Sequence, residues 1–99
     1  MKKETKFNSA GFLENPDDWN FDIMYQIAER EGITLTNEAI GYIKLARKLY
    51  FETGTVPVLR DFSKLTGGDR KGKHLVKMFN GRPMSQIAKL GGMPPPSGC

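Results

Sequence analysis

The sequence has very little cysteine, no long apolar run and no export signal, and each absence excludes a class of protein. One cysteine among 99 residues cannot form an internal disulfide, and with one histidine it cannot build a structural zinc site. No run of about 20 apolar residues is present to cross a membrane. The basic residues 1–6 are not followed by the apolar segment of a secretory signal. We therefore expect a cytoplasmic protein without a membrane span, and we assign it no metal or other cofactor.

What is present suits one small domain. With 38% hydrophobic and 26% charged residues, the chain has apolar material for one modest core and differs from a disordered chain. Its net charge of +4 is unevenly distributed, with four Lys/Arg against eight Asp/Glu in residues 1–43 and eleven against three in residues 44–99. This split predicts either a basic surface for an anionic partner or an ordinary set of solvated helix faces. Trp19, the single tryptophan, is expected to be a packing residue without a site role.

Caps, prolines and apolar spacing predict a mainly α fold of about five short helices. Residues 7–13 place apolar ends around an Asn/Ser/Gly turn, which predicts a short N-terminal hairpin or an extended arm. The third helix is expected to bury Val58, Leu59, Phe62 and Leu65. The expected helices run from the Asn15-Pro16 cap to Gly32, from the Thr36 cap to Gly54, from Pro57 to Gly67-Gly68, across Leu75, Val76 and Phe79, and from Pro83 to Gly91-Gly92.

The last seven residues differ from the rest of the chain. Three consecutive prolines at 94–96 exclude a helix and favour an extended polyproline segment, with Cys99 as the last residue. We therefore divide the chain into a helical domain over 1–92 and a flexible arm over 93–99. A lone cysteine is usually a packed core residue, but one that follows Gly98 and a proline run is expected to expose its thiol.

Such an arm suits a protein that carries a chemical group. From Leu90 to Cys99 the extended chain would reach about 28–30 Å. A thiolate is the nucleophile, and the adjacent terminal carboxylate opposes its formation, so basic side chains of the domain or of a partner would have to support it. The candidate supports are Arg60, Lys64, Lys77 and Arg82, with Arg70, Lys71, Lys73 and Lys89 as further ones. The arm and its docking contacts are assigned to Gly92, Pro94, Pro96 and Gly98, with Gly91-Gly92 and Gly98 as pivots.

The arm and the residues before it occur in a distinctive order, namely Met78-Phe79-Asn80-Gly81-Arg82-Pro83, then Gln86, then Leu90-Gly91-Gly92-Met93-Pro94-Pro95-Pro96-Ser97-Gly98-Cys99. This order resembles the C-terminal signature of the DsrC/TusE family, approximately Phe-Pro-x-Gly-Pro, then Gln, then Ile-Ala-Gly-Leu-Pro-Lys-Pro-Thr-Gly-Cys-Val. The likeness spans residues 7–99. Its upstream part consists of Gly11-Phe12-Leu13, Trp19, Glu31-Gly32-Ile33-Thr34-Leu35, Tyr50 and Pro57-Val58-Leu59-Arg60.

The resemblance implies both a fold and a function. The fold would be an orthogonal bundle of short helices with a helix-turn-helix-like core, an N-terminal β-hairpin and a flexible arm. Cys99 would carry sulfur as a persulfide, and the chain would be a stoichiometric carrier in sulfurtransferase reactions rather than an autonomous enzyme. The implied partners are a sulfur-transfer complex of the TusBCD or DsrEFH type, a tRNA-thiolating enzyme and, as an alternative, dissimilatory sulfite reductase.

Three departures from the family pattern bear on this reading. Redox-active members carry a second cysteine eleven positions before the last, and Ala88 stands there in this chain, which favours a single-thiol relay over the sulfite reductase role. Pro95 replaces the usual Lys, and Asn80-Gly81-Arg82 replaces Pro-x-Gly, so the docking surface is expected to differ. The residue that usually follows the last cysteine is absent from the sequence.

Two other classes fit parts of the sequence. A helix-turn-helix DNA-binding regulator would explain the basic second half, with Arg60, Lys64 and Arg70 on phosphates and an affinity that falls steeply with salt. The helix over 58–65 offers few side chains suited to base edges, however, which leaves weak nucleic-acid binding as a secondary activity. A self-sufficient thiol enzyme would need a base, and His74 is expected to be a solvated surface side chain.

Overall fold

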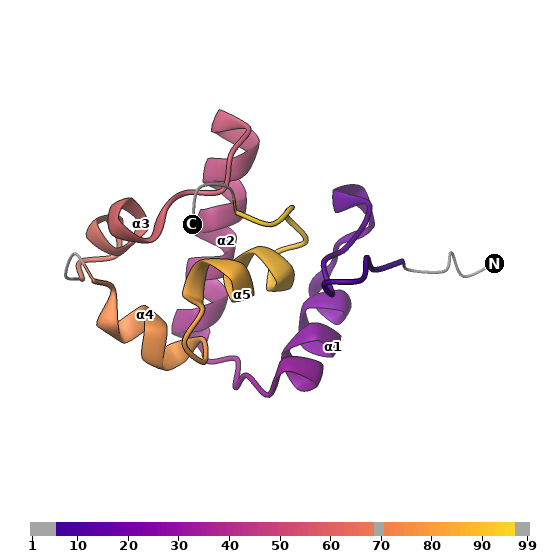
Figure 1. The fold of residues 1–99 in the computed structure, drawn as a ribbon, viewed down its shortest axis with the longest axis horizontal. Coiled ribbons are helices and arrows are strands. Elements are labelled where there is room, and N and C mark those ends of the chain that lie inside the picture. Colours follow the sequence, from indigo (N-terminus) through magenta and orange to yellow (C-terminus); the bar gives the residue numbers. More distant parts are fainter. Residues whose placement is uncertain (1–5, 69–70, 97–99) are drawn as a thin grey trace.

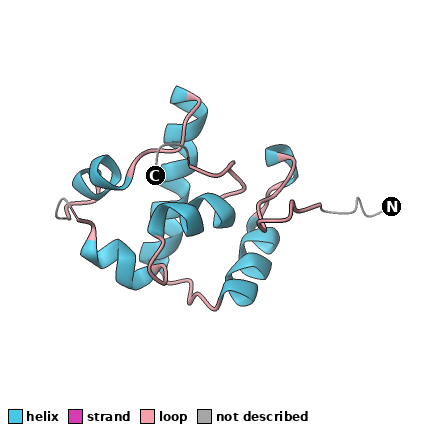
Figure 2. Cartoon of the chain, viewed as in Figure 1, coloured by secondary structure: helices cyan, strands magenta, loops and turns pink. Residues whose placement is uncertain are grey.

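The computed structural model describes residues 6–68 and 71–96, and all regular structure in these residues is helical (Figure 2). A short 3-10 turn, η1 (Pro16–Asp18), precedes the first helix. None of the described helices combines the length and the apolar character needed to cross a membrane. The prediction of a mainly α fold with five short helices is confirmed for the described residues. The helices are α1 (Phe21–Glu31), α2 (Asn37–Thr53), α3 (Leu59–Leu65), α4 (Lys73–Met78) and α5 (Pro83–Leu90).

Helix α5 lies at the centre of the molecule, with α1, α2 and α4 packed against it (Figure 1). Its residues Ile87, Ala88 and Leu90 are fully shielded from solvent, as are Ile27 of α1 and Ile43 of α2 in the same core cluster. Burial of each large aliphatic side chain contributes about 1.5–3 kcal/mol. The apolar faces of three helices therefore fix the position of α5, and with it the point where the C-terminal segment begins.

Side-chain caps and a terminal glycine define α2 as the sequence predicts. Thr36 Oγ1 accepts a hydrogen bond from the Ala39 N–H at 3.1 Å, a contact that contributes about 1 kcal/mol to helix stability. Gly54 ends the helix with a left-handed φ of 81°, which costs glycine little. Both predicted boundaries of α2 are confirmed.

The first helix starts later than predicted. Asn15 caps only the η1 turn, and Trp19 then adopts an extended backbone conformation. Asn20 starts α1 anew, because its Oδ1 accepts from the Ile23 N–H at 2.9 Å. The prediction of one continuous helix from Asn15 is therefore wrong, since a second capping asparagine follows five residues later. Because Trp19 lies in this break with an extended backbone, its side chain points in a different direction from that of a residue inside a helix.

Residues 7–13 form a turn, closed by the Asn8 N–H that donates to the Phe12 carbonyl at 2.7 Å and by the Asn8 side chain, and not the predicted β-hairpin. Phe7 and Leu13 make one isolated antiparallel bridge. Within the turn, Asn8 Oδ1 accepts from the N–H groups of Ala10 at 3.0 Å and Phe12 at 2.9 Å. The Phe12 N–H is thereby bonded to a side chain and not to the partner backbone of a ladder. The hairpin prediction is wrong, and no strand forms in the part of the chain that the structure describes.

Helix α3 buries fewer residues than predicted. It begins after Val58, so Pro57 lies before the cap and not at the first helical position. Phe62 is fully buried, but Val58 and Leu65 are 45% and 61% exposed, so the prediction that both face inward is wrong. Both exposed residues lie at the ends of the helix, since Val58 is the N-cap with an extended backbone and Leu65 is the last residue of α3, so the core covers only the middle of the helix.

His74 of α4 is half-buried, whereas the sequence predicted a solvated side chain. Its ring packs edge-on against Tyr42 of α2, with centroids 6.0 Å apart. Its Nε2 lies 3.3 Å from Thr66 Oγ1, just beyond the end of α3. The histidine therefore joins α2, α3 and α4, which is a packing role.

Candidate functional site

The predicted carrier residue Cys99, together with Gly98, lies outside the described residues. The structure describes the preceding segment as far as Pro96, and it thereby shows how this segment is attached to the domain. We call residues 90–93, where α5 ends and the chain leaves the core, the arm root.

The arm root is a helix end closed by a glycine. Gly92 adopts a left-handed φ of 69°. Its N–H donates to the Lys89 carbonyl at 3.2 Å, and the Met93 N–H donates to the Ala88 carbonyl at 2.9 Å. This pair of bonds is a Schellman motif, which satisfies carbonyl groups that the end of a helix leaves free. The motif returns the chain to the core, where Met93 is fully buried.

Trp19 covers the arm root from the segment that precedes α1. Its indole Nε1–H donates to the Leu90 carbonyl at 2.7 Å. A Cβ atom added at Gly92 would lie 2.7–2.9 Å from atoms of the Trp19 side chain, so the indole rests directly on the glycine. Trp19 is thus a packing residue, as the sequence predicted, and its half-buried ring packs on the arm root.

Arg47 of α2 completes the enclosure of the root. Its Nη1 donates to the Gly91 carbonyl, and its guanidinium carbon lies 3.9 Å from the centroid of the Trp19 ring and 5.0 Å from that of Phe51. Burial lowers the pKa of Arg47, but a guanidinium stays protonated at neutral pH. The positive charge faces the carbonyl end of α5, where the helix dipole is negative.

Beyond the root, the chain stays close to the body of the domain. Pro94 and Pro96 are half-buried, whereas Pro95 is exposed. In Figure 1 this segment turns back from the end of α5 towards α2. Gly92, which the sequence suggested as a pivot, is buried, because the Schellman motif and the Trp19 ring hold it. These two contacts therefore hold the bend that the chain makes at Gly92.

The four cations proposed from the sequence as supports lie on other parts of the surface. Arg60 and Lys64 are exposed on α3, and Lys77 is exposed on α4. Arg82 precedes the first residue of α5, at the opposite end of that helix from the root. Arg60 forms an exposed ion pair with Asp61 at 3.8 Å. In the described part of the chain, none of these four side chains is bonded to the arm root.

The cation that does bond to the root, Arg47, was missed by the sequence analysis. A signal for it was present, because Arg47 lies four residues after the buried Ile43 and four before Phe51, on one edge of α2. A charged side chain bordering a core-facing stripe is unusual unless a partner compensates it. The identity of that partner, a carbonyl 44 positions away, is not visible in any local pattern.

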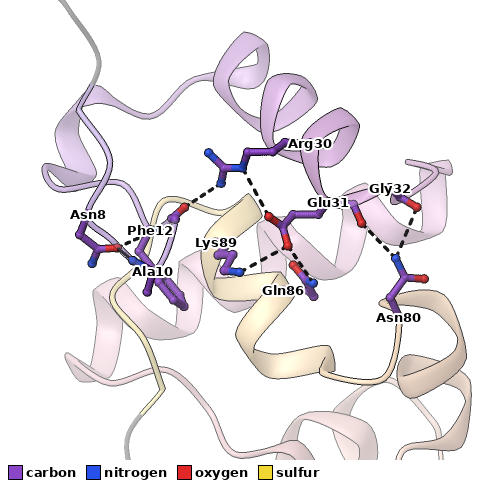
Figure 3. A network of polar contacts seen from close by, with 10 residues as sticks. Asn8, Ala10, Phe12, Arg30, Glu31, Gly32, Asn80, Gln86 and Lys89 are labelled. Atoms are coloured by element: carbon purple, nitrogen blue, oxygen red, sulfur yellow. Dashed lines mark hydrogen bonds and ion pairs between the residues drawn. The ribbon is translucent and has the colours of Figure 1, made fainter.

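On its other side, α5 is tied to α1 through Glu31 (Figure 3). Glu31 Oε1 accepts from Gln86 Nε2 at 3.2 Å and from Lys89 Nζ at 3.4 Å. Burial alone would raise the pKa of Glu31, but the hydrogen bond from Gln86 and the charge of Lys89 outweigh it and lower the pKa. Arg30, 3.4 Å from Glu31 Oε2, also donates to the Gly11 carbonyl at 2.8 Å and so joins the N-terminal turn to α1.

The position of the family's second cysteine is occupied by Ala88, a fully buried residue of α5. Among the described residues, no group of three or more His, Cys, Asp and Glu side chains could hold a metal ion. The groups at the root are backbone carbonyls, one indole and one guanidinium. Such groups are suited to fixing a chain segment in place.

Comparison with known proteins identifies the family. The family described as DsrC like protein matches residues 1–99. The chain belongs to this family. Sulfurtransferase TusE from Yersinia pseudotuberculosis serotype I (strain IP32953) is 33% identical to it over 97 residues, which cover 93% of this chain and 90% of the relative.

Solved structures agree with this DsrC family membership. The NMR structure of Allochromatium vinosum DsrC superposes with a TM-score of 0.85 and 30% identity, over 98% of this chain and 91% of that chain. A chain in the crystal structure of dissimilatory sulfite reductase I gives a TM-score of 0.82 and 28% identity, over 96% of this chain and 90% of that chain. The five described helices therefore form a DsrC fold.

Proposed function

We propose that this DsrC-family chain is a sulfur-relay protein that carries sulfur as a persulfide on Cys99. The relative Sulfurtransferase TusE from Yersinia pseudotuberculosis is similar to this chain over 90% of its own length. The observation that carries the proposal is the position of the last core residue. Met93 is fully buried, and six residue steps separate it from the single cysteine. At about 3.1–3.3 Å per step, the thiol would reach about 19–20 Å from the root, enough to enter a partner's active site.

The proposed chemistry moves one sulfur atom without net oxidation. The Cys99 thiolate attacks the outer sulfur of a donor persulfide, a new S–S bond forms, and the donor leaves as a thiolate when its own S–S bond breaks. An acceptor thiolate then attacks the outer sulfur on Cys99, and Cys99 leaves as a thiolate. Each cycle moves one sulfur atom on one thiol and needs both a donor and an acceptor, so the chain is a stoichiometric carrier and not an autonomous enzyme.

Ala88, which stands where redox-active members carry a second cysteine, decides which of the proposed partners is favoured. With one thiol in the chain, no intramolecular cysteine bridge can form, so a single-thiol relay in the cytoplasm is favoured. The proposed donor is a sulfur-transfer complex of the TusBCD or DsrEFH type, and the proposed acceptor is a tRNA-thiolating enzyme. The similarity to a chain in dissimilatory sulfite reductase I makes that enzyme the alternative partner. Exposed Arg60, Lys64, Lys77 and Arg82 are proposed as docking cations for these partners.

The DNA-binding alternative is not supported. The relatives found are a sulfurtransferase and DsrC or sulfite reductase chains. At the two ends of α3, the N-cap Val58 and the last residue Leu65 are exposed, and their apolar side chains are poor readers of base edges. We propose that α3 and α4 form a helix-turn-helix-like scaffold in an orthogonal bundle, with a structural role.

The test is the intact mass of the protein after incubation with glutathione persulfide. We expect the wild type to gain one sulfur atom and Cys99→Ser to gain none. Alkylation of the wild-type thiol before and after loading checks that Cys99 is accessible. A wild type that gains no sulfur, although its thiol reacts with an alkylating reagent, would contradict the proposal.

A further inference from the structure

We propose that Arg47 and Trp19 are positioning residues that hold the arm root, so that residues 90–93 stay fixed to the domain during sulfur transfer. This inference rests on the proposed function, because it assigns the fixed end of the segment that carries Cys99. It goes beyond the carrier role itself, since it names the side chains that determine where the thiol starts and how far it travels.

The first argument comes from the carbonyl groups at the end of α5. The Ile87, Ala88 and Lys89 carbonyls accept from the N–H groups of the chain's own last turn. The next two carbonyls along the chain, of Leu90 and Gly91, accept from Trp19 Nε1 and Arg47 Nη1. Side chains from two other segments thus satisfy the groups that the Schellman motif leaves free. Without them, two carbonyls near the core would be unpaired or would draw in water.

The second argument is that the Arg47 guanidinium makes two contacts at once, one with its flat face and one with an N–H at its edge. Its guanidinium stacks at 3.9 Å on the Trp19 ring while its edge donates to the Gly91 carbonyl. A planar, delocalised cation can make both contacts together, whereas a lysine ammonium cannot. The indole in turn bonds Leu90 and lies on Gly92. The two side chains therefore form one clamp over three consecutive residues, 90–92.

The consequence concerns delivery of the thiol. A fixed root limits the volume that the moving segment explores, which raises the effective concentration of the thiol near a docked partner. It also lowers the ordering entropy that must be lost when the arm enters an active site. A root that frayed back to Ala88 would give a longer, less directed arm.

The chain is suited to a direct test because it has one tryptophan and one cysteine. A naphthalene dye on Cys99 accepts energy from Trp19, and time-resolved fluorescence then gives the distribution of distances between them. Unlabelled protein of each variant supplies the donor reference. Release of the root to Ala88 in Arg47→Met lengthens the mobile segment from six to eleven steps, so we expect the distribution to widen by about a third. Amide exchange at Gly92 and Met93 should be about tenfold faster.

Lys48→Met is the matched control, because Lys48 is the exposed neighbour of Arg47 on α2 and its loss removes the same charge. We expect this control to leave both readouts at their wild-type values. Gly92→Ala is a second variant, which keeps every charge but places a Cβ against Trp19, and it should widen the distribution as well. If Arg47→Met does not fold, Arg47→Lys replaces it, with faster exchange at the root expected.

The outcomes separate this inference from the proposed function. If folded Arg47→Met and Gly92→Ala both keep the wild-type distribution and exchange rates, the positioning role is overturned. Loading of one sulfur from glutathione persulfide in unlabelled protein of the same variants, whose Cys99 thiol is free of dye, would then leave the carrier role standing. If instead the root is released as expected but no variant, wild type included, loads sulfur, the carrier role fails while the clamp stands.

Discussion

The two sides of α5 are each held by one charged residue from a neighbouring helix, and the two attachments differ in what they hold. On the α1 side, Glu31 bonds side chains of α5, Gln86 and Lys89, so it fixes the helix as a body. On the α2 side, Arg47 bonds the backbone beyond the last turn, at Gly91. A contact with side chains of a helix fixes the position of that helix. A contact with a backbone carbonyl just after the helix fixes the segment that follows it. The first attachment therefore belongs to the scaffold and the second to the arm root.

Removal of the indole should produce the largest effect, on the arm side of this comparison. Trp19→Ala deletes the bond to Leu90, the stacking partner of Arg47 and a half-buried ring, so we expect a loss of about 3 kcal/mol in the free energy of unfolding. Urea unfolding followed by circular dichroism measures it. Trp19→Phe keeps a ring without the N–H donor and should lose about half as much. A loss under about 1 kcal/mol for Trp19→Ala would show that the ring does not hold the root.

A methyl group at the root should produce the next largest effect. Gly92→Ala combines a left-handed backbone at φ 69° with a Cβ that would overlap the indole, so we expect a loss of about 2–3 kcal/mol in the free energy of unfolding. Gly81→Ala is the matched control, because Gly81 has φ 88° but no atom within 4 Å of its added Cβ. The control should lose only the backbone term, about 1 kcal/mol. Equal losses in the two variants would remove the argument for close packing at Gly92.

On the scaffold side, the expected effect is smaller and depends on pH. Glu31→Gln should lower the free energy of unfolding by about 1 kcal/mol at pH 7, because the charge that Lys89 and Gln86 face is gone. The pKa of Glu31 in the fold lies below its ordinary value of 4.5, so the carboxylate stabilises the fold above that pH and ceases to do so as pH falls through the lowered pKa.

Urea unfolding of wild type and Glu31→Gln at pH 7 and pH 3 measures this dependence. The difference between the two proteins should shrink at the lower pH, since Glu31 of the wild type is then neutral in an increasing fraction of molecules, as the glutamine of the variant is at every pH. A difference that grew on acidification would contradict the assignment. Amide exchange at Gly92 and Met93 should stay at its wild-type rate in Glu31→Gln, which distinguishes the scaffold side from the arm side.

The smallest effect is expected on the exposed surface, away from both attachments. Arg60→Gln removes an exposed ion pair with Asp61, and pairs of this kind contribute about 0–1 kcal/mol. We therefore expect the free energy of unfolding to change by less than about 0.5 kcal/mol and sulfur loading on Cys99 to stay the same. Loading that fell to zero would show that Arg60 supports the thiol directly, as one reading of the sequence suggested.

The sequence predicted the parts of this protein that local patterns govern. The Thr36 cap and Gly54 bound α2, and Pro83 opens α5, because caps and prolines act within a few residues of themselves. The N-terminal hairpin and the continuous first helix were wrong, since Asn8 and Asn20 use their side chains in ways that periodicity does not reveal. Local patterns therefore fix helix ends better than they fix loops.

The candidate site was predicted less well, for a physical reason. The bonds that define the arm root join Trp19 to Leu90 and Arg47 to Gly91, 71 and 44 positions apart in the chain. No local spacing encodes contacts over such separations. The exposed cations singled out from the sequence are surface residues, and the cation that matters at the root is a half-buried one, which only the fold brings there.

The central claim, that Cys99 relays sulfur, is tested most directly by following one sulfur atom through the chain. The wild type is loaded with sulfur-34 from glutathione persulfide, freed of donor and mixed with a reduced tRNA-thiolating enzyme, and both proteins are weighed intact over time. The account predicts that sulfur-34 leaves Cys99 and appears on the acceptor in equal amount, with Cys99→Ser inactive. Sulfur-34 that stayed on Cys99, or left it only as free sulfide, would contradict the account.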